Sequence, residues 1–341
     1  MSAAPAARPL ALAAPSAPPA ADPITPVFVL SAPRSGSTLV QRVLSVHRDV
    51  ATASEPWLLL PLLAPLRERF PPGGRWHVQV SQALHDFTAT LPGGADDYRA
   101  AMRAAALRLY RDAAGPQPRF YLDKTPPYAL LADELLATFP DARVLILWRN
   151  PLAVVASIVE TFCGGRWRPD DYAVSLFAGL DALVAAARRH AGRVVTARFE
   201  QLVGGDPDVW RATAGALGLP FDERALAEFG GVRLDGRLGD PTGVRAYGAL
   251  SSQPLEKWRA TLAPPLRRAW CRRYLRWIGA DRLAAMGYAL DELLAQLDAL
   301  PPAHVTTPRD AADLARAFAR DAVRAQLSRP RPPSSWRRLL A

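Results

Sequence analysis

The sequence has little cysteine, little histidine and no long hydrophobic run. Among its 341 residues only Cys163 and Cys271 are cysteines, too few for a disulfide framework or a thiolate metal site. The five histidines never fall at a metal-ligand spacing, so we expect no bound metal. Apolar stretches such as residues 144–148 end long before the roughly 20 residues that a membrane span requires.

The N-terminal residues 1–26 form an alanine- and proline-rich string. This string lacks the basic segment and unbroken apolar core of a secretory signal, and its composition predicts a disordered tail over residues 1–23. We therefore expect a cytoplasmic protein whose single folded domain covers residues 24–300.

Basic residues outnumber acidic ones by 42 to 32, which gives a net charge of +10. Such an excess is compatible with nucleic acid, acidic lipid or a polyanionic small molecule as a partner. Half of the excess falls in residues 301–341, which hold eight arginines and three aspartates. We expect a basic, partly helical tail there.

Lysine is rare, because only Lys124 and Lys257 occur among the 42 basic residues. A lysine is a compact, mobile point charge that arginine does not replace, and the difference matters most where a small anionic group is transferred. Both lysines are therefore candidates for chemistry, the alternative being a chance remnant of codon usage.

Apolar runs that predict strands alternate with helical patterns along the chain. The strand candidates are residues 27–32, 51–54, 120–123, 143–148 and 193–199. This alternation favours an α/β fold in which a parallel sheet is flanked by helices. A helical insertion is predicted at about residues 57–118, and the part after residue 206 is mostly helical. A glycine-rich stretch at residues 230–248 is interpreted as a long functional loop or ligand clamp.

A polar turn joins the first predicted strand to a helix. It contains Arg34, Ser35, Gly36, Ser37 and Thr38. A turn of this kind directs backbone N–H groups and the positive end of the helix dipole at one point, which favours anion binding. It is not a Walker A loop, because Ser31 and Ser37 occupy the positions that would need Gly and Lys. Taken alone, a turn of this composition is more often a simple helix N-cap.

Two further pairs of residues follow predicted strands. Arg149 leaves the strand at residues 143–148, and Ser157 lies two turns into the next helix, so together they are candidates to hold a phosphate. Glu55 and Lys124 follow the strands at residues 51–54 and 120–123. A carboxylate that accepts a proton and an ammonium that offsets a developing oxyanion suit transfer of an anionic group to a hydroxyl. The simpler interpretations are a strand-end arginine with an exposed serine, and a surface ion pair.

Four segments, in order, resemble the sulfotransferases that use 3′-phosphoadenosine 5′-phosphosulfate (PAPS). FVLSAPRSGSTLVQRVLSVHRDV resembles their 5′-phosphosulfate loop, and RVLILWRNPLAVVAS resembles their 3′-phosphate motif. ARFEQLVGGDPDVW with LGLPFD, and then LEKW, resemble later segments of the family. The resemblance runs from about residue 27 to residue 258 and implies a P-loop-type parallel sheet. It is nearest to the branch that contains protein-tyrosine sulfotransferases and many bacterial relatives.

The resemblance implies a role for each candidate residue. Glu55 would be the catalytic base and Lys124 the transition-state stabiliser. The cofactor-binding residues would be Arg34, Ser35, Gly36, Ser37 and Thr38 on the 5′-phosphosulfate, Arg149 and Ser157 on the 3′-phosphate, and Lys257 near the cofactor. Both rare lysines thus fall on family motifs.

The chain also departs from the family pattern. Phe199 stands where the branch usually has a cofactor-contacting tyrosine, and Thr161 stands where a second basic residue is common. The serine that assists transfer corresponds to Ser251 or Ser252. The Golgi members' membrane anchor and luminal disulfides have no counterpart in this sequence, so sulfation in the secretory pathway is not implied.

The implied mechanism is in-line attack of an acceptor hydroxyl on the sulfur of PAPS, without a metal. The sequence does not decide whether the acceptor is a small molecule, a carbohydrate or a peptide tyrosine. It also leaves the oligomeric state open. Two alternatives are a P-loop kinase with Asp123 as a magnesium ligand, and a nucleic-acid-binding protein that uses the arginine-rich residues 267–276. A membrane partner is not expected.

Overall fold

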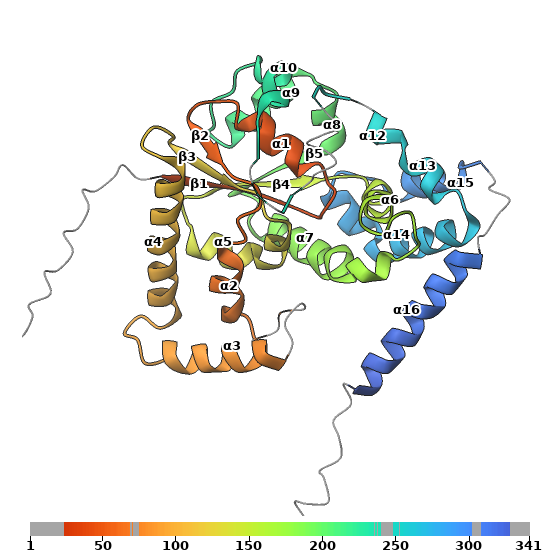
Figure 1. Ribbon diagram of the computed structural model, residues 1–341, viewed down its shortest axis with the longest axis horizontal. Helices are drawn as coiled ribbons and strands as arrows, with labels where there is room; N and C mark the ends of the chain where they lie inside the picture. The colour runs from red at the N-terminus through yellow and green to blue at the C-terminus, as the bar shows by residue number, and fades with distance from the viewer. Residues whose placement is uncertain are drawn as a thin grey trace, which may run out of the picture.

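The computed structural model describes residues 24–68, 70, 75–234, 236, 238–239, 248–251, 253–301 and 308–327. A five-stranded sheet, all parallel, lies at its centre in the order β2-β3-β1-β4-β5 (Figure 1). The strands are β1 (Thr25–Ser31), β2 (Val50–Thr52), β3 (Phe120–Asp123), β4 (Arg143–Trp148) and β5 (Val194–Arg198). The predicted α/β fold with a parallel, P-loop-type sheet is confirmed.

The central strands β1 and β4 form because their sequences are unbroken apolar runs that are buried on both faces. Alternate side chains enter different cores. Val27 and Val29 belong to one hydrophobic cluster, and Phe28 and Leu30 belong to the other. Helices must therefore cover the sheet on both sides.

One face is covered by α1 (Ser37–Leu44), α8 (Phe199–Val203), α9 (Pro207–Ala216), α10 (Ala225–Glu228) and the short η5 (Phe229–Gly231). The opposite face is covered by η2 (Pro126–Leu131), α5 (Ala132–Thr138), α6 (Pro151–Phe162), the π-helical η4 (Val174–Gly179), α7 (Leu180–Arg189) and α14 (Pro265–Ala285). Figure 1 shows α1, α9 and α10 above the sheet and α5 and α7 below it. The short η3 (Pro169–Tyr172) follows α6.

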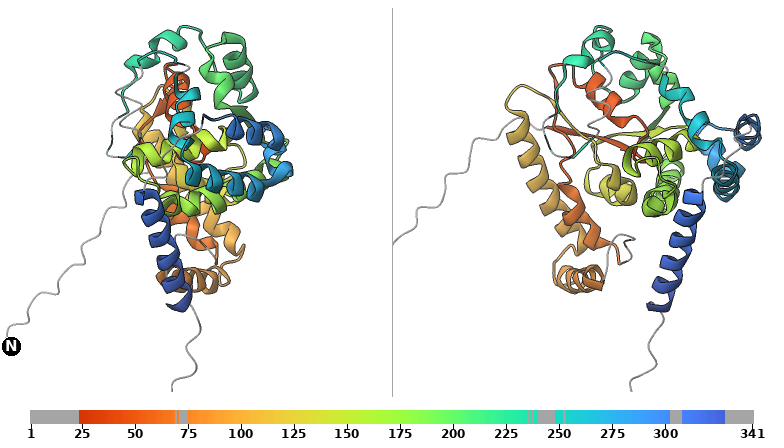
Figure 2. Two further views of the ribbon diagram at one scale, coloured as in Figure 1. Left: turned by 90° about the vertical axis from the view of Figure 1, so that its right-hand side faces the viewer. Right: turned by 45° about the vertical axis from the view of Figure 1, so that its right-hand side comes forward.

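The connection between β2 and β3 is helical. It contains α2 (Leu59–Leu63), η1 (Ala64–Leu66), α3 (Arg75–Thr88) and α4 (Ala95–Ala114). In Figures 1 and 2, α3 lies at the far end of α4, well away from the sheet. The connection thus extends the molecule on one side and returns the chain to β3.

The C-terminal part is also helical. It comprises α12 (Gln253–Glu256), α13 (Trp258–Leu262), α14, α15 (Leu290–Asp298) and α16 (Pro308–Leu327). The helix α14 is interrupted at Gly279, which has a φ of 78°. The predicted N-terminal tail, residues 1–23, lies outside the described residues, and of the predicted C-terminal tail, residues 301–341, only residues 301 and 308–327 are described. No helix in the described ranges is both long and apolar enough to cross a lipid bilayer.

The helix α16 projects from the body (Figure 2) and is held at its first turns by two buried carboxylates. Asp310 accepts hydrogen bonds from Arg267 at 2.7 and 2.9 Å. Asp313 accepts from Arg166 Nε at 3.1 Å and from Arg168 Nε at 3.2 Å. Both aspartates are almost fully buried, so each depends on its arginines for compensation of its charge.

We predict that Asp313→Ala lowers the free energy of unfolding by about 1–3 kcal/mol, because it leaves two arginines without their shared carboxylate. The matched control is Asp112→Ala, which removes an exposed i,i+4 pair with Arg108 and should change stability by less than about 0.5 kcal/mol. Urea unfolding measures both variants. Equal effects would contradict the anchoring role of Asp313.

Candidate active site

The carboxyl end of every strand carries one of the residues that the sequence singled out. Lys124, Arg149 and Phe199 directly follow β3, β4 and β5, while Arg34 and Glu55 lie three residues beyond β1 and β2. Because the strands are parallel and adjacent, these five positions share one edge of the sheet.

The turn between β1 and α1 has an unusual backbone. Arg34 has a φ of 68° and Gly36 a φ of 89°, and no side chain caps the first turn of α1. A Cβ at Gly36 would lie 2.2 Å from the ring of Phe199, so glycine is required both by conformation and by space. The turn therefore presents the uncapped N-terminus of α1, an arrangement suited to binding an anion.

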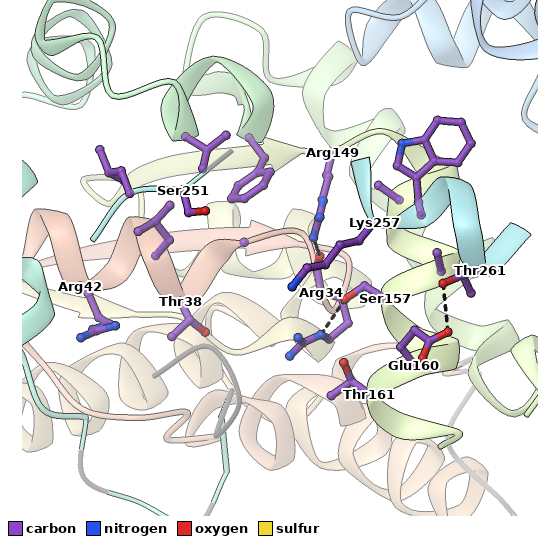
Figure 3. Close-up of a pocket in the computed structure, with 18 of the residues that line it drawn as sticks. Arg34, Thr38, Arg42, Arg149, Ser157, Glu160, Thr161, Ser251, Lys257 and Thr261 are labelled. Atoms are coloured by element: carbon purple, nitrogen blue, oxygen red, sulfur yellow. Dashed lines mark hydrogen bonds between the residues drawn. The ribbon is translucent and has the colours of Figure 1, made fainter. Parts of the chain in front are cut away.

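A cavity of about 440 Å³ lies beside this turn (Figure 3). Its lining includes six of the predicted cofactor-binding residues: Arg34, Gly36, Thr38, Arg149, Ser157 and Lys257. The other two, Ser35 and Ser37, are buried and do not line it. Segments that are more than 200 residues apart in the sequence thus contribute to one cavity.

The cations of the cavity are held in place by neighbouring groups. Arg34 Nε donates to Ser157 Oγ at 3.2 Å, and Arg149 Nη1 donates to the carbonyl oxygen of Arg34 at 2.7 Å. The Arg149 guanidinium also lies 4.6 Å from the centre of the Phe199 ring. Figure 3 shows Arg34, Arg149 and Lys257 converging on the same space, which suits a ligand with several negative charges.

Sequence reasoning missed Arg42, which also lines the cavity. It is almost fully buried, and burial lowers the pKa of its guanidinium. Arg42 Nη2 donates to the carbonyl oxygen of Gly230 at 2.8 Å, and its guanidinium lies 5.2 Å from the centre of the Phe229 ring. The sequence spacing could have indicated this position, because Arg42 is four residues after Thr38 and so lies on the same face of α1.

The two residues that depart from the family pattern, Phe199 and Thr161, both line the cavity. Next to Thr161, the carboxylate of Glu160 accepts a hydrogen bond from Thr261 Oγ1 at 2.9 Å. The last turn of α6, with Glu160 and Thr161, is therefore neutral or acidic where it lines the cavity, whereas Arg34 lies against Ser157, one turn earlier on the same helix (Figure 3).

Glu55 and Lys124 form a close pair. The Lys124 ammonium donates to Glu55 Oε1 at 2.6 Å, and the side chains are 2% and 11% exposed for Lys124 and Glu55. The indole of Trp57 donates to the other carboxylate oxygen at 3.3 Å. Neither partner of the pair lines the cavity; they lie at the ends of β2 and β3, on the side of β1 opposite to β4.

The glycine-rich segment contacts both parts of the site. Ser54, next to Glu55, donates a hydrogen bond to the carbonyl oxygen of Leu238, and a Cβ at Gly236 would lie 2.6 Å from Ser54. Further along the chain, Ser251 lines the cavity. Ser252 and residues 240–247 lie outside the described residues. Gly236 and Leu238 of the segment thus lie next to Ser54 at the Glu55 end of the sheet, and Ser251, which follows the segment, lines the cavity.

Asp123, the magnesium ligand of the kinase alternative, is inaccessible. Its side chain is fully buried and accepts hydrogen bonds from the hydroxyls of Tyr110, Thr125 and Tyr128 at 2.7–3.1 Å. Burial raises the pKa of its carboxyl to about 6. A carboxylate enclosed by three hydroxyl donors is not placed to bind a nucleotide-bound ion.

The arginine-rich face proposed for nucleic-acid binding is largely engaged within the protein. Arg267 pairs with Asp310, Arg268 donates to two main-chain carbonyls, and Arg272 pairs with Asp298. These three arginines stabilise contacts of the C-terminal helices, whereas Arg273 and Arg276 of the same segment are exposed.

The fold and its cationic cavity define a P-loop-like α/β protein suited to a ligand with several anionic groups. The sequence profile of the sulfotransferase family matches residues 26–223, more than half of the chain. The chain therefore belongs to the sulfotransferase family.

The chain is also similar to individual proteins, the first of which it matches over less than two thirds of that protein's own length. The chain is 29% identical over 296 residues to nodulation protein NoeE of Sinorhizobium fredii, covering 76% of this chain and 65% of that protein. It is 26% identical over 266 residues to protein-tyrosine sulfotransferase 1 of Danio rerio, covering 71% of each. The sulfotransferase domain from the curacin biosynthetic pathway aligns in structure with a TM-score of 0.50 and 20% identity, covering 76% of this chain and 98% of that domain. This last match supports the fold alone.

We predict that Gly36→Ala lowers the free energy of unfolding by at least about 2 kcal/mol, because the new Cβ would meet the Phe199 ring at a positive φ. The control is Gly94→Ala. Gly94 is also a helix N-cap with a positive φ, but nothing lies within 4 Å of its Cβ position. Urea unfolding should show the larger loss at Gly36, and equal losses would contradict the close approach of Phe199.

The raised pKa of Asp123 predicts a pH dependence of stability. Between pH about 4 and about 6 the folded protein keeps a proton that the unfolded chain has lost, so this group's contribution to the free energy of unfolding falls as the pH rises through that window. Lys124 and the three hydroxyl donors lower the pKa, and burial outweighs them. In the wild type, this group should make the free energy of unfolding on the order of 2 kcal/mol lower at pH 6 than at pH 4, and Asp123→Asn should remove that difference. Parallel pH curves for variant and wild type, from urea unfolding, would contradict this.

Proposed function

We propose that this protein transfers the sulfuryl group of PAPS to a hydroxyl acceptor. The observation that carries the proposal is the Glu55–Lys124 pair at the ends of β2 and β3, beside a cationic cavity that begins at the end of β1. A proton acceptor and a cation next to an anion-binding turn are the groups that transfer of an anionic group to a hydroxyl requires.

The residues of the cavity fit PAPS. A volume of about 440 Å³ lies in the usual range for small-molecule sites. The N-terminus of α1, together with Arg34 to Thr38, would hold the 5′-phosphosulfate, and Arg149 with Ser157 would hold the 3′-phosphate. Lys257 adds a third cation to the same space. Phe199 offers a ring face where the family branch usually has a tyrosine hydroxyl, so we expect cofactor binding without that hydrogen bond.

In the proposed reaction, Glu55 accepts the proton of the acceptor hydroxyl as its oxygen bonds to sulfur and the bond from sulfur to the nucleotide phosphate oxygen breaks. Lys124 offsets negative charge on the oxygen that leaves. The Lys124 ammonium also orients the Glu55 carboxylate through the 2.6 Å hydrogen bond to Oε1. When bound, PAPS supplies the activated sulfuryl group. This group carries less negative charge than a terminal phosphoryl group, so arginine and lysine can replace a metal ion.

The acceptor class stays open among small molecules, carbohydrates and peptide tyrosines. Ser251 is the serine we propose to assist transfer, since it lines the cavity. A cytoplasmic location, the single domain of residues 24–300 and its helical insertion remain predictions from the sequence.

We predict that 3′-phosphoadenosine 5′-phosphate raises the melting temperature by about 5–10 °C at a concentration of about 100 times its Kd, because it binds the native state alone. AMP should have a much smaller effect, since it lacks the 3′-phosphate. Arg149→Ala should abolish the selectivity for the 3′-phosphate, and Arg48→Ala, at an exposed arginine, should keep it.

Glu55→Gln separates binding from chemistry in the same assay. The variant should keep the shift in melting temperature but lower kcat with any active acceptor by about 10²-fold or more, measured with PAPS labelled in its sulfuryl group. Stabilisation by ATP with magnesium alone would refute the proposed donor.

A further inference from the structure

A buried network at the end of β3 is not used by the proposed chemistry. Asp123 Oδ2 accepts hydrogen bonds from the hydroxyls of Tyr110 at 2.7 Å and Tyr128 at 3.1 Å, and Oδ1 accepts from Thr125 Oγ1 at 2.9 Å. Asp123 and Thr125 are completely buried, and so is Tyr128. A hydroxyl has one proton, so each of these three directs its proton to the carboxylate.

The remaining lone pairs of two hydroxyls hold the segment that follows Glu55. Thr125 Oγ1 accepts from the main-chain N–H of Trp57 at 3.4 Å, and the Tyr128 hydroxyl accepts from the N–H of Leu59 at 2.9 Å. The segment between Glu55 and α2 is therefore attached to the network at two main-chain positions. The orientation of both acceptors depends on Asp123.

This attachment has a direct consequence for Glu55. Trp57 has a φ of 53°, which is rare for a bulky residue and costs about 1–3 kcal/mol unless its surroundings enforce it. In this conformation its indole N–H reaches Glu55 Oε2, while Lys124 reaches Glu55 Oε1. Both oxygens of the Glu55 carboxylate are thus oriented by a donor. Lys124 orients Oε1 directly, and the indole of Trp57, whose main-chain N–H is attached to Thr125, orients Oε2.

We propose that Thr125 and Tyr128, oriented by Asp123, are positioning residues. Through the main chain of residues 57–59 they hold the Glu55 carboxylate in its position against the Lys124 ammonium. The inference rests on the proposed role of Glu55 as the base. A merely structural network would affect stability alone, whereas a positioning network must affect the geometry of this pair.

The matched variants are Thr125→Val, which keeps the shape and removes the hydroxyl, and Thr125→Ser, which keeps the hydroxyl. Thr125→Val should lower kcat by about 10- to 100-fold, because a small displacement of a reacting group is costly, while KM for PAPS stays within about twofold. Thr125→Ser should restore kcat. Tyr128→Phe, which keeps the ring, is the second test and should lower kcat in the same way.

A second readout does not depend on activity. Lys124 and Lys257 are the only lysines of the chain, so acylation by acetic anhydride can be followed at each of them by mass spectrometry. In the wild type, buried Lys124 should react far more slowly than exposed Lys257. Thr125→Val and Tyr128→Phe should each raise the rate at Lys124 at least about threefold relative to Lys257, with both variants kept well below their melting temperatures.

The two readouts separate failure of this inference from failure of the proposed function. Unchanged labelling of Lys124 in both variants, or an equal loss of kcat in Thr125→Ser, would overturn the positioning role. Faster labelling at Lys124 in a protein that transfers no sulfuryl group would support the coupling of the network to the pair and refute only the reaction.

Discussion

The hydrogen bond from Arg149 to the main-chain carbonyl of Arg34 joins the end of β4 to the turn after β1. This bond forms because β1 and β4 are paired in parallel register, with Ser31 opposite Leu147. It holds the turn in a conformation with two positive φ values, and that conformation leaves the N-terminus of α1 free to face the cavity. Phe199, which begins α8 at the end of β5, packs against both Arg149 and Gly36 and closes the arrangement from the other side.

The site combines two different electrostatic environments along one edge of the sheet. Around the turn, four basic side chains, Arg34, Arg42, Arg149 and Lys257, line an open cavity, which favours a polyanionic ligand. At the ends of β2 and β3, a cation and a carboxylate neutralise one another in a nearly buried position. In the proposed reaction, the first environment would bind the anionic groups of the donor and the second would accept the proton of the acceptor hydroxyl.

Distant parts of the chain stabilise this edge. Asp313 on α16 accepts hydrogen bonds from Arg166 and Arg168, which lie in the loop after α6. The same helix α6 carries Ser157 and Thr161 into the cavity, and Phe162 at its end lies 5.5 Å from the Arg34 guanidinium. The C-terminal helix thus supports a wall of the site that it does not itself reach.

The sequence by itself determined the parallel α/β fold, because strands buried on both faces must be unbroken apolar runs and the helices between them must return the chain to the same edge. It also located the residues that follow those strands, since their identity is local. It did not determine the strand order or the burial of Arg42. Nor did it show that Asp123, a candidate metal ligand in the sequence, is buried and accepts hydrogen bonds from three hydroxyls. These features depend on contacts such as Tyr110 with Asp123 and Arg42 with Gly230, which join elements that no local pattern relates. Only the packing of those elements decided which polar groups face the cavity and which are enclosed.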